Sequence, residues 1–223
     1  MRTMVDLSGP SFGPAVGGKP RRLVILLHGY GSDGNDLLGL APHWARQLPD
    51  TEFVSPHAPF PCEAAPFGRQ WFGFEGRSES MMLAETQTAA GILDAFVDGA
   101  LARRNLAEDS LALVGFSQGT MMALHVAPRR ARAVAAVVGY SGMLIAPQLL
   151  AAEIKSRPPV LLVHGTADPV VPYASLATAQ AALHDVGIAV KTETRRGLAH
   201  AIDEEGLALG GDFIAAAFAP AKA

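Results

Sequence analysis

The strongest chemical signal in the sequence is a serine placed between two glycines, in the run Gly115-Phe116-Ser117-Gln118-Gly119. Apolar residues 111–114 precede this G-x-S-x-G pattern, and a helix-compatible stretch follows it. A sharp turn from strand to helix needs small flanking residues, because its backbone passes close to neighbouring atoms. The turn would present the Ser117 hydroxyl beside a helix N-terminus, which favours developing negative charge. Ser117 is therefore a candidate nucleophile, and an inert turn serine is the simpler alternative.

Two residues further along the chain could activate this hydroxyl, which is a poor nucleophile without a base. Asp168 follows the apolar run 160–163, and His200 follows a weaker strand pattern over residues 188–194. Each residue alone could be a turn acid or a helix cap. In the order Ser, Asp, His, however, they match the α/β-hydrolases, and parallel strands deliver them to one edge of a sheet. The pattern predicts a triad with His200 as base and Asp168 as its orienting acid.

A glycine-rich turn after the first apolar run, residues 23–27, has two functional interpretations. One is a dinucleotide site of an oxidoreductase, because the spacing G-x-G-x-x-G is met by Gly29, Gly31 and Gly34. Such a site also needs an acid at the end of the second strand to bind a ribose. That strand ends in Ser55-Pro56-His57 instead.

The other interpretation is an H-G-x-G turn that begins at His28 and donates a backbone N–H to an oxyanion hole. The two donors would be the backbone N–H groups of Tyr30 and Gln118. We favour this interpretation, because the rest of the chain supplies a nucleophile and no ribose-binding acid. A non-catalytic protein that retains a hydrolase fold is a third alternative.

The composition describes a compact, apolar-rich chain with no strong charge. Of the 223 residues, 49% are hydrophobic and 17% are charged, against a usual charged share of about 25%. This excludes an extended disordered chain and a coiled coil covered with charges. The net charge is −3, and no run of lysine or arginine is longer than a pair, which argues against nucleic-acid and anionic-membrane partners.

Short apolar runs alternate with helical patterns along the whole chain. Strands are expected at residues 23–27, 52–55, 111–114, 134–138, 160–163 and 188–194. Helices are expected at residues 36–47, 81–104 with Ser80 as N-cap, 118–127, 173–186 and 201–218. We therefore expect one domain over residues 1–223, with the α/β-hydrolase fold: a mostly parallel central sheet with helices on both faces. Residues 1–20 should form an extended edge strand or loop.

The sequence also bears on location and on bound groups. Cys62 is the only cysteine, so no intramolecular disulfide is expected. The first ten residues lack the apolar run of a signal peptide, and aliphatic runs reach only about five residues against the roughly 20 of a membrane span. We expect a cytoplasmic protein without stable membrane insertion. The remaining histidines lack metal-ligand spacing, so we expect structural roles and no metal for His28, His43, His57, His125, His164 and His184.

Five motifs together resemble the phospholipase/carboxylesterase family, which includes acyl-protein thioesterases. They are the H-G-x-G turn, Pro59-Phe60 before Gln70-Trp71-Phe72, the G-x-S-x-G run, the run Gly165-Thr166-Ala167-Asp168-Pro169-Val170-Val171-Pro172, and His200. The resemblance spans about residues 22–215. It implies the triad Ser117, Asp168 and His200, backbone oxyanion donors at Tyr30 and Gln118, Trp71 in the acyl pocket, and no cofactor. Thr120 departs from a glycine that many members carry there, and it should tighten packing under the turn.

The spacing of the last strands bears on the substrate. Only residues 139–159 separate two of them, which leaves no room for a separate cap domain. We expect an open apolar groove lined by Trp71, Phe74, Met143, Leu144 and Val170. Such a groove discriminates acyl chains weakly, by about 0.8 kcal/mol per buried methylene. The expected substrates are small esters with short to medium acyl chains, with thioesters and lysophospholipids as further candidates. The sequence leaves the oligomeric state open, a homodimer included.

Overall fold

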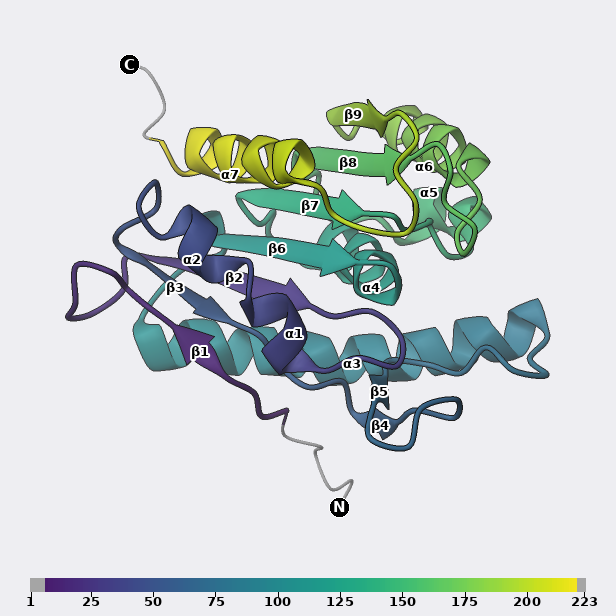
Figure 1. Cartoon of the computed structure of the whole chain (residues 1–223), viewed down its shortest axis with the longest axis horizontal. Helices are drawn as coiled ribbons and strands as arrows, with labels where there is room; N and C mark the ends of the chain where they lie inside the picture. The colour runs from purple at the N-terminus through teal and green to yellow at the C-terminus, as the bar shows by residue number, and fades with distance from the viewer. Residues whose placement is uncertain (1–6, 220–223) are drawn as a thin grey trace.

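The computed structural model describes residues 7–219 and arranges them around a seven-stranded sheet (Figure 1). The strand order is β1-β3-β2-β6-β7-β8-β9, and the edge strand β1 alone of these pairs antiparallel with its neighbour. The sheet strands are β1 (Ser11–Phe12), β2 (Arg22–Leu27), β3 (Thr51–Val54), β6 (Leu111–Phe116), β7 (Ala136–Tyr140), β8 (Val160–Gly165) and β9 (Val190–Arg195). This confirms the expected α/β fold with a mostly parallel sheet.

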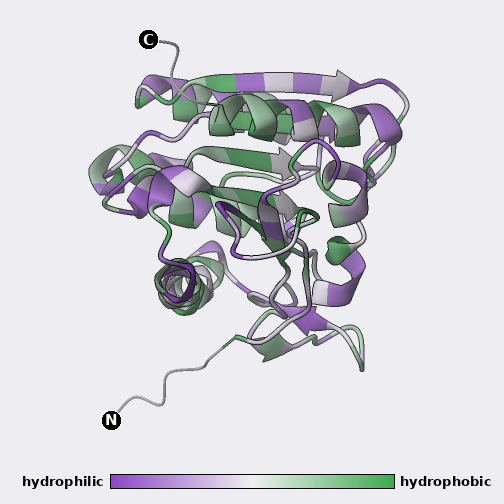
Figure 2. Cartoon of the chain, turned by 90° about the vertical axis from the view of Figure 1, so that its left-hand side faces the viewer, coloured by the Kyte–Doolittle hydropathy of each residue, from purple (hydrophilic) through white to green (hydrophobic). Residues whose placement is uncertain are grey.

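The central strands are apolar because helices cover both of their faces. All residues of β7 and β8 are buried, and those of β2 and β6 are buried except for the end residues Arg22 and Phe116. Figure 2 shows this hydrophobic centre between more polar outer elements. The edge strand β9 is only half-buried, which is why its sequence lacks the continuous apolar run of the central strands.

Two helical layers complete the fold. Apolar residues of α1 (Gly34–Leu38), α2 (Ala41–Trp44) and α7 (Glu204–Phe218) pack on one face of the sheet. Those of α3 (Glu79–Arg104), α4 (Gln118–Val126), α5 (Leu150–Glu153) and α6 (Ala174–Asp185) pack on the other. Short 3₁₀ turns occupy Glu108–Ser110, Ala127–Arg129 and Pro147–Leu149. The strands β4 (Phe60–Pro61) and β5 (Arg69–Gln70) form a separate small hairpin.

Two helix predictions need correction. The helix expected over residues 36–47 is split into α1 and α2, because Gly39 caps the first and Pro42 lies in the first turn of the second. The expected N-cap of α3 at Ser80 is wrong. Ser78 caps this helix instead, with Ser78 Oγ accepting a hydrogen bond from Met81 N at 3.3 Å.

The segments at the start of the chain and between β7 and β8 bear on the remaining fold predictions. The strand or loop expected over residues 1–20 contains β1, and its first six residues lie outside the described part. Between β7 and β8, residues 141–159 hold one 3₁₀ turn and the four-residue helix α5. No helix within residues 7–219 is long and apolar enough to cross a membrane.

Candidate active site

Ser117 lies in the turn between β6 and α4 and adopts the strained backbone conformation that the motif predicts. Its φ is 53° and its ψ is −116°, which is rare for a residue with a side chain. A Cβ on Gly119 would lie 1.8 Å from Leu27 O, and one on Gly115 would lie 2.3 Å from the carbonyl carbon of Gly119. Both glycines are therefore required by close backbone approach, which holds the serine at the carboxyl end of β6.

Thr120 stabilises the turn that carries Ser117 through two hydrogen bonds. Its hydroxyl lies 2.8 Å from two backbone oxygens, Gly115 O and Tyr140 O, and so ties the ends of β6 and β7 together. A Cβ on Gly139 or Gly142 would come within 2.5 Å of the Thr120 side chain. These two glycines make the room that the larger residue at position 120 needs.

Asp168 and His200 come together as predicted, from the loop after β8 and the loop before α7. The distance between Asp168 Oδ2 and His200 Nδ1 is 2.8 Å. Because a carboxylate only accepts, His200 carries a proton on Nδ1, and Nε2 is left as the acceptor that a general base needs. The ring of Phe116 packs against the imidazole, with 4.8 Å between their centroids. No hydrogen bond recorded for residues 7–219 joins Ser117 Oγ to His200, and such bonds are often long before substrate binds.

The Asp168 carboxylate is held ionised although its side chain has no exposed surface. Burial alone raises the pKa of Asp168. Hydrogen bonds donated by His200, Val171 N and Val170 N outweigh burial and leave the pKa below its ordinary value. The carboxylate can therefore orient a neighbouring imidazole across the neutral pH range.

The glycines of the turn after β2 are explained by packing and by backbone conformation. A Cβ on Gly34 would lie 2.0 Å from Ser55 O, and one on Gly29 would lie 3.2 Å from the Phe116 ring. Gly31 has a φ of +80°, which suits glycine. The spacing that matched a dinucleotide site is thus explained by internal packing, which removes the ground for the oxidoreductase alternative.

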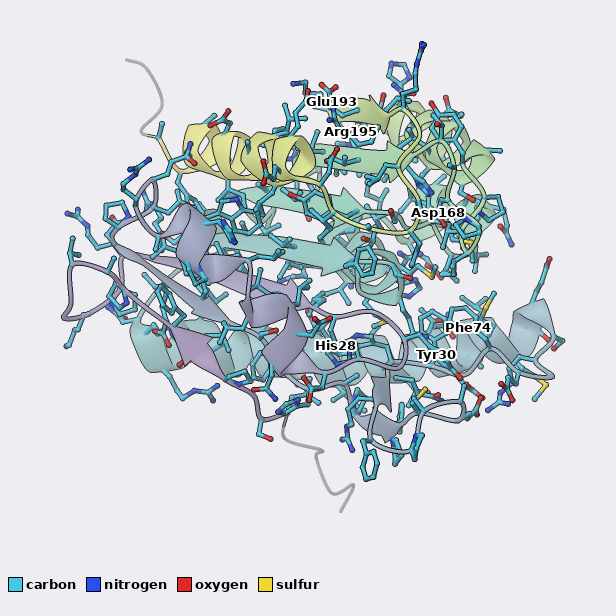
Figure 3. All side chains as sticks on the ribbon, in the orientation of Figure 1. His28, Tyr30, Phe74, Asp168, Glu193 and Arg195 are labelled. Carbon is cyan, nitrogen blue, oxygen red and sulfur yellow. The ribbon has the colours of Figure 1, made fainter. Side chains whose placement is uncertain are left out.

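The predicted oxyanion donors lie on this turn and on α4. Among the described residues, the backbone N–H groups of Tyr30 and Gln118 take part in no recorded hydrogen bond outside regular helices and strands. Figure 3 shows Tyr30 beside Phe74 on one side of the carboxyl edge of the sheet and Asp168 on the other. The ring centroids of Tyr30 and Phe74 are 5.3 Å apart.

Side chains that sequence reasoning missed hold this turn in place. Gln118 Oε1 accepts from Trp71 N at 2.8 Å, and Gln118 Nε2 donates to Phe72 O at 2.7 Å. Arg69 donates to Ala58 O, and its backbone bonds to Gly31 and Ser32. The only sequence signal for the contact between Gln118 and Trp71 was the polar side chain directly after Ser117.

The predicted groove residues differ widely in exposure. Trp71 is wholly buried, and its indole N–H donates to His28 O at 3.0 Å. The expectation of an accessible pocket wall at Trp71 is therefore corrected: the ring packs beneath the turn that carries Tyr30. Phe74 is 37% exposed and Val170 is 63% exposed. Met143 is half-buried and Leu144 is buried.

Trp71→Ala should destabilise the protein by about 3–5 kcal/mol, because it removes a fully buried aromatic ring and its hydrogen bond. Urea denaturation measures the change in the free energy of unfolding. Phe67→Ala is the matched control, since Phe67 is 96% exposed and its loss should change stability by less than about 0.5 kcal/mol. If the urea midpoint of Trp71→Ala equals that of the wild type, Trp71 is not a core residue, and the expectation that it lines the acyl pocket stands.

A hollow lies away from the candidate active-site residues, between α3, the end of α4 and α5. Its volume is about 490 Å³, and none of Ser117, Asp168 and His200 lines it. His125 borders it with a buried Nδ1 that has no partner among residues 7–219. Burial, with a contribution from Arg129, lowers the pKa of His125 to about 4. Because its Nδ1 is unpaired within the described residues, His125 differs from a structural histidine whose ring nitrogens are both bonded. Its side chain is neutral at pH 7.

Comparison with known proteins places this chain in a family. The model of the phospholipase/carboxylesterase family matches residues 15–218. Acyl-protein thioesterase 1 of Neurospora crassa is 29% identical over 210 residues, which cover 86% of this chain and 84% of that protein. Esterase YpfH of Escherichia coli is 29% identical over 191 residues, which cover 84% of this chain and 79% of that protein.

Solved structures agree with the sequence relatives. The crystal structure of esterase PE8 superposes with a TM-score of 0.90 at 44% identity, covering 94% of this chain and 98% of that one. The crystal structure of Arabidopsis thaliana SOBER1, at 20% identity and a TM-score of 0.79, shares the fold. From this match over nearly the whole described chain, we conclude that the protein is a hydrolase of the phospholipase/carboxylesterase family.

Proposed function

We propose that this hydrolase is a serine carboxylesterase that cleaves short to medium acyl esters through Ser117, His200 and Asp168. His200 Nε2 takes the proton of the Ser117 hydroxyl as Oγ attacks the ester carbonyl carbon. The N–H groups of Tyr30 and Gln118 stabilise the resulting oxyanion. His200 then gives its proton to the departing alcohol oxygen, which leaves an acyl-enzyme on Ser117.

Water completes the cycle. His200 accepts a proton from a water molecule that attacks the acyl carbonyl, and then returns it to Ser117 Oγ as the acid product leaves. The single observation that carries the proposal is the 2.8 Å contact between Asp168 Oδ2 and His200 Nδ1. It assigns the imidazole tautomer that this cycle requires. The strained Ser117 turn supports it.

Labelling with a fluorophosphonate tests the proposed nucleophile, and a chain-length series tests the substrate class. Wild type should be labelled at Ser117 and should hydrolyse p-nitrophenyl esters and acyl thioesters of two to twelve carbons. Each added methylene should change kcat/KM by no more than about fourfold, because burial of one methylene contributes about 0.8 kcal/mol. No jump in rate is expected above the solubility limit of the ester. Absence of labelling would refute the proposed nucleophile.

Phe74→Ala should reduce the gain in kcat/KM per methylene, because Phe74 is half-exposed beside Tyr30 and can contact an acyl chain. Phe67→Ala removes the same ring from a fully exposed position and should leave the chain-length series unchanged. The measurement is the slope of log kcat/KM against chain length for both variants. Equal slopes in Phe74→Ala and wild type would remove Phe74 from the acyl site.

The pH profile of kcat/KM should rise to a plateau through a single step, because His200 must be neutral to accept a proton. Asp168 should not contribute a second step to this rise. Its pKa is lowered in the folded chain, so the stability it contributes is present above about pH 3.9 and is lost only as pH falls through the folded value. A profile that is flat from pH 5 to 9 would contradict a histidine base.

A further inference from the structure

His164 is a second histidine that contacts the Asp168 carboxylate. It lies on β8, four residues before Asp168, and only 1% of its side chain is exposed. Its Nε2 is 3.0 Å from Val171 O and 3.3 Å from Asp168 Oδ2. Both neighbours are acceptors at neutral pH, so the ring proton is assigned to Nε2. Its hydrogen bond goes to Val171 O, and the contact with Asp168 Oδ2 is electrostatic.

Both oxygens of the Asp168 carboxylate have neighbouring N–H groups. Oδ1 accepts from Val170 N at 2.8 Å and from Val171 N at 2.9 Å. Oδ2 lies 2.8 Å from His200 Nδ1 and 3.3 Å from His164 Nε2. The same carboxylate oxygen therefore faces two imidazole N–H groups, and its negative charge is shared between them.

We propose that His164 is a positioning residue of the reaction: its Nε2–H, held by Val171 O, lies against Asp168 Oδ2 and draws charge from it, and so limits how strongly Asp168 stabilises the cationic form of His200. This inference rests on the proposed function. His164 itself is buried and contacts no substrate. A purely structural histidine, which closes the turn of residues 165–171 through Val171 O, is the alternative to be tested.

The other groups around this pair of imidazoles are uncharged or paired elsewhere. The ring of Tyr173 lies edge-on to His164 with centroids 6.1 Å apart, and its hydroxyl bonds Thr194 on β9. Thr194 is the register partner of His164, so the flanking Glu193 and Arg195 alternate to the opposite face. Glu193 pairs with Lys191, and Arg195 pairs with Asp203 and Glu205. From the β6 side the Phe116 ring covers His200.

Replacement of His164 by leucine should change the pH profile and kcat but not KM. Without the Nε2–H donor, Oδ2 keeps more negative charge and stabilises the His200 cation in the resting enzyme. The acid limb of the kcat/KM profile should then move to higher pH. Loss of one fixed donor to a charged group should lower kcat by about tenfold.

His164→Gln is the conservative variant, because its amide N–H can take the place of Nε2–H and should restore most of kcat and the wild-type acid limb. His164→Asn is the matched control, since it keeps an amide that is one methylene too short to reach Asp168 Oδ2. If His164→Leu fails to fold, the comparison of Gln with Asn decides. An acid limb that stays in place in Leu or Asn, or that moves equally in Gln, would overturn the proposal.

Fluorophosphonate labelling of the wild type separates this result from a failure of the proposed function. If wild type is labelled at Ser117 and shows the single acid limb, but the His164 variants leave that limb in place, the positioning role alone is refuted. If wild type is not labelled, the nucleophile assignment fails first. Thermal melting of every variant at pH 7 reports the structural contribution of the contact with Val171 O.

Discussion

Ser117→Ala should lower kcat by about 10⁴ to 10⁶ while leaving the protein folded. The expected loss is large because the nucleophile, base and orienting acid act as a unit. Alanine can occupy the same tight turn, since Gly115 and Gly119 rather than the serine side chain make the close approaches. Residual catalysis from the oxyanion donors and from substrate binding should remain. The measurement is steady-state hydrolysis of p-nitrophenyl esters alongside thermal melting.

Ser141→Ala is a matched control for this substitution. Ser141 also follows a sheet strand, has a φ of 47° and is buried, and its hydroxyl has no partner among residues 7–219. Its loss breaks no hydrogen bond, so activity should stay within a few-fold of wild type. A Ser117→Ala enzyme that kept a tenth of the wild-type rate would show that another residue is the nucleophile.

His200→Ala should cost about as much as Ser117→Ala, and the double variant should cost little more than either. This non-additivity follows because neither residue can do its part of the reaction without the other. If the two residues contributed independently, the fold-losses in kcat of the single variants would multiply in the double variant. Such a multiplied loss would contradict a hydroxyl activated by His200, however large the loss in each single variant.

Much of the fold could be predicted from the sequence because the central strands are buried on both faces. The apolar runs of β2, β6 and β8 have no other environment than the middle of a covered sheet. Predictions were less accurate where local and tertiary signals compete. The helix expected over residues 36–47 breaks at Gly39, and the strand expected over residues 134–138 lies at Ala136–Tyr140.

The site could be predicted only as far as short motifs reach. Ser117, Asp168 and His200 each follow a strand in a recognisable local pattern. The contact of Gln118 with Trp71 spans 47 residues, and no local spacing indicates it. The burial of Trp71 followed from the same long-range packing. His164 was classed with the structural histidines because it lacks metal-ligand spacing, although its contact with Asp168 depends only on the loop geometry after β8.

Asp168→Asn should lower kcat by about 10⁴ with little change in the folded structure, because asparagine has nearly the same shape as aspartate. The N–H groups of Val170 and Val171 fix the oxygen at the Oδ1 position, so the amide NH₂ must take the place of Oδ2. That NH₂ would point a donor at His200 Nδ1 and favour the tautomer with its proton on Nε2. His200 then cannot accept the Ser117 proton.

Asp203→Asn is the control that separates this tautomer effect from the loss of any nearby charge. Asp203 is a carboxylate of the loop that carries His200, but it caps α7 and pairs with Arg195 rather than with His200. Asparagine is also a good N-cap, so this variant should keep kcat and lose little stability. Fluorophosphonate labelling should slow in Asp168→Asn as kcat does, because phosphonylation needs the same activated hydroxyl. If Asp168→Asn stays within tenfold of wild type while Asp203→Asn does not, the orienting acid is Asp203 and the 2.8 Å contact of Asp168 has another purpose.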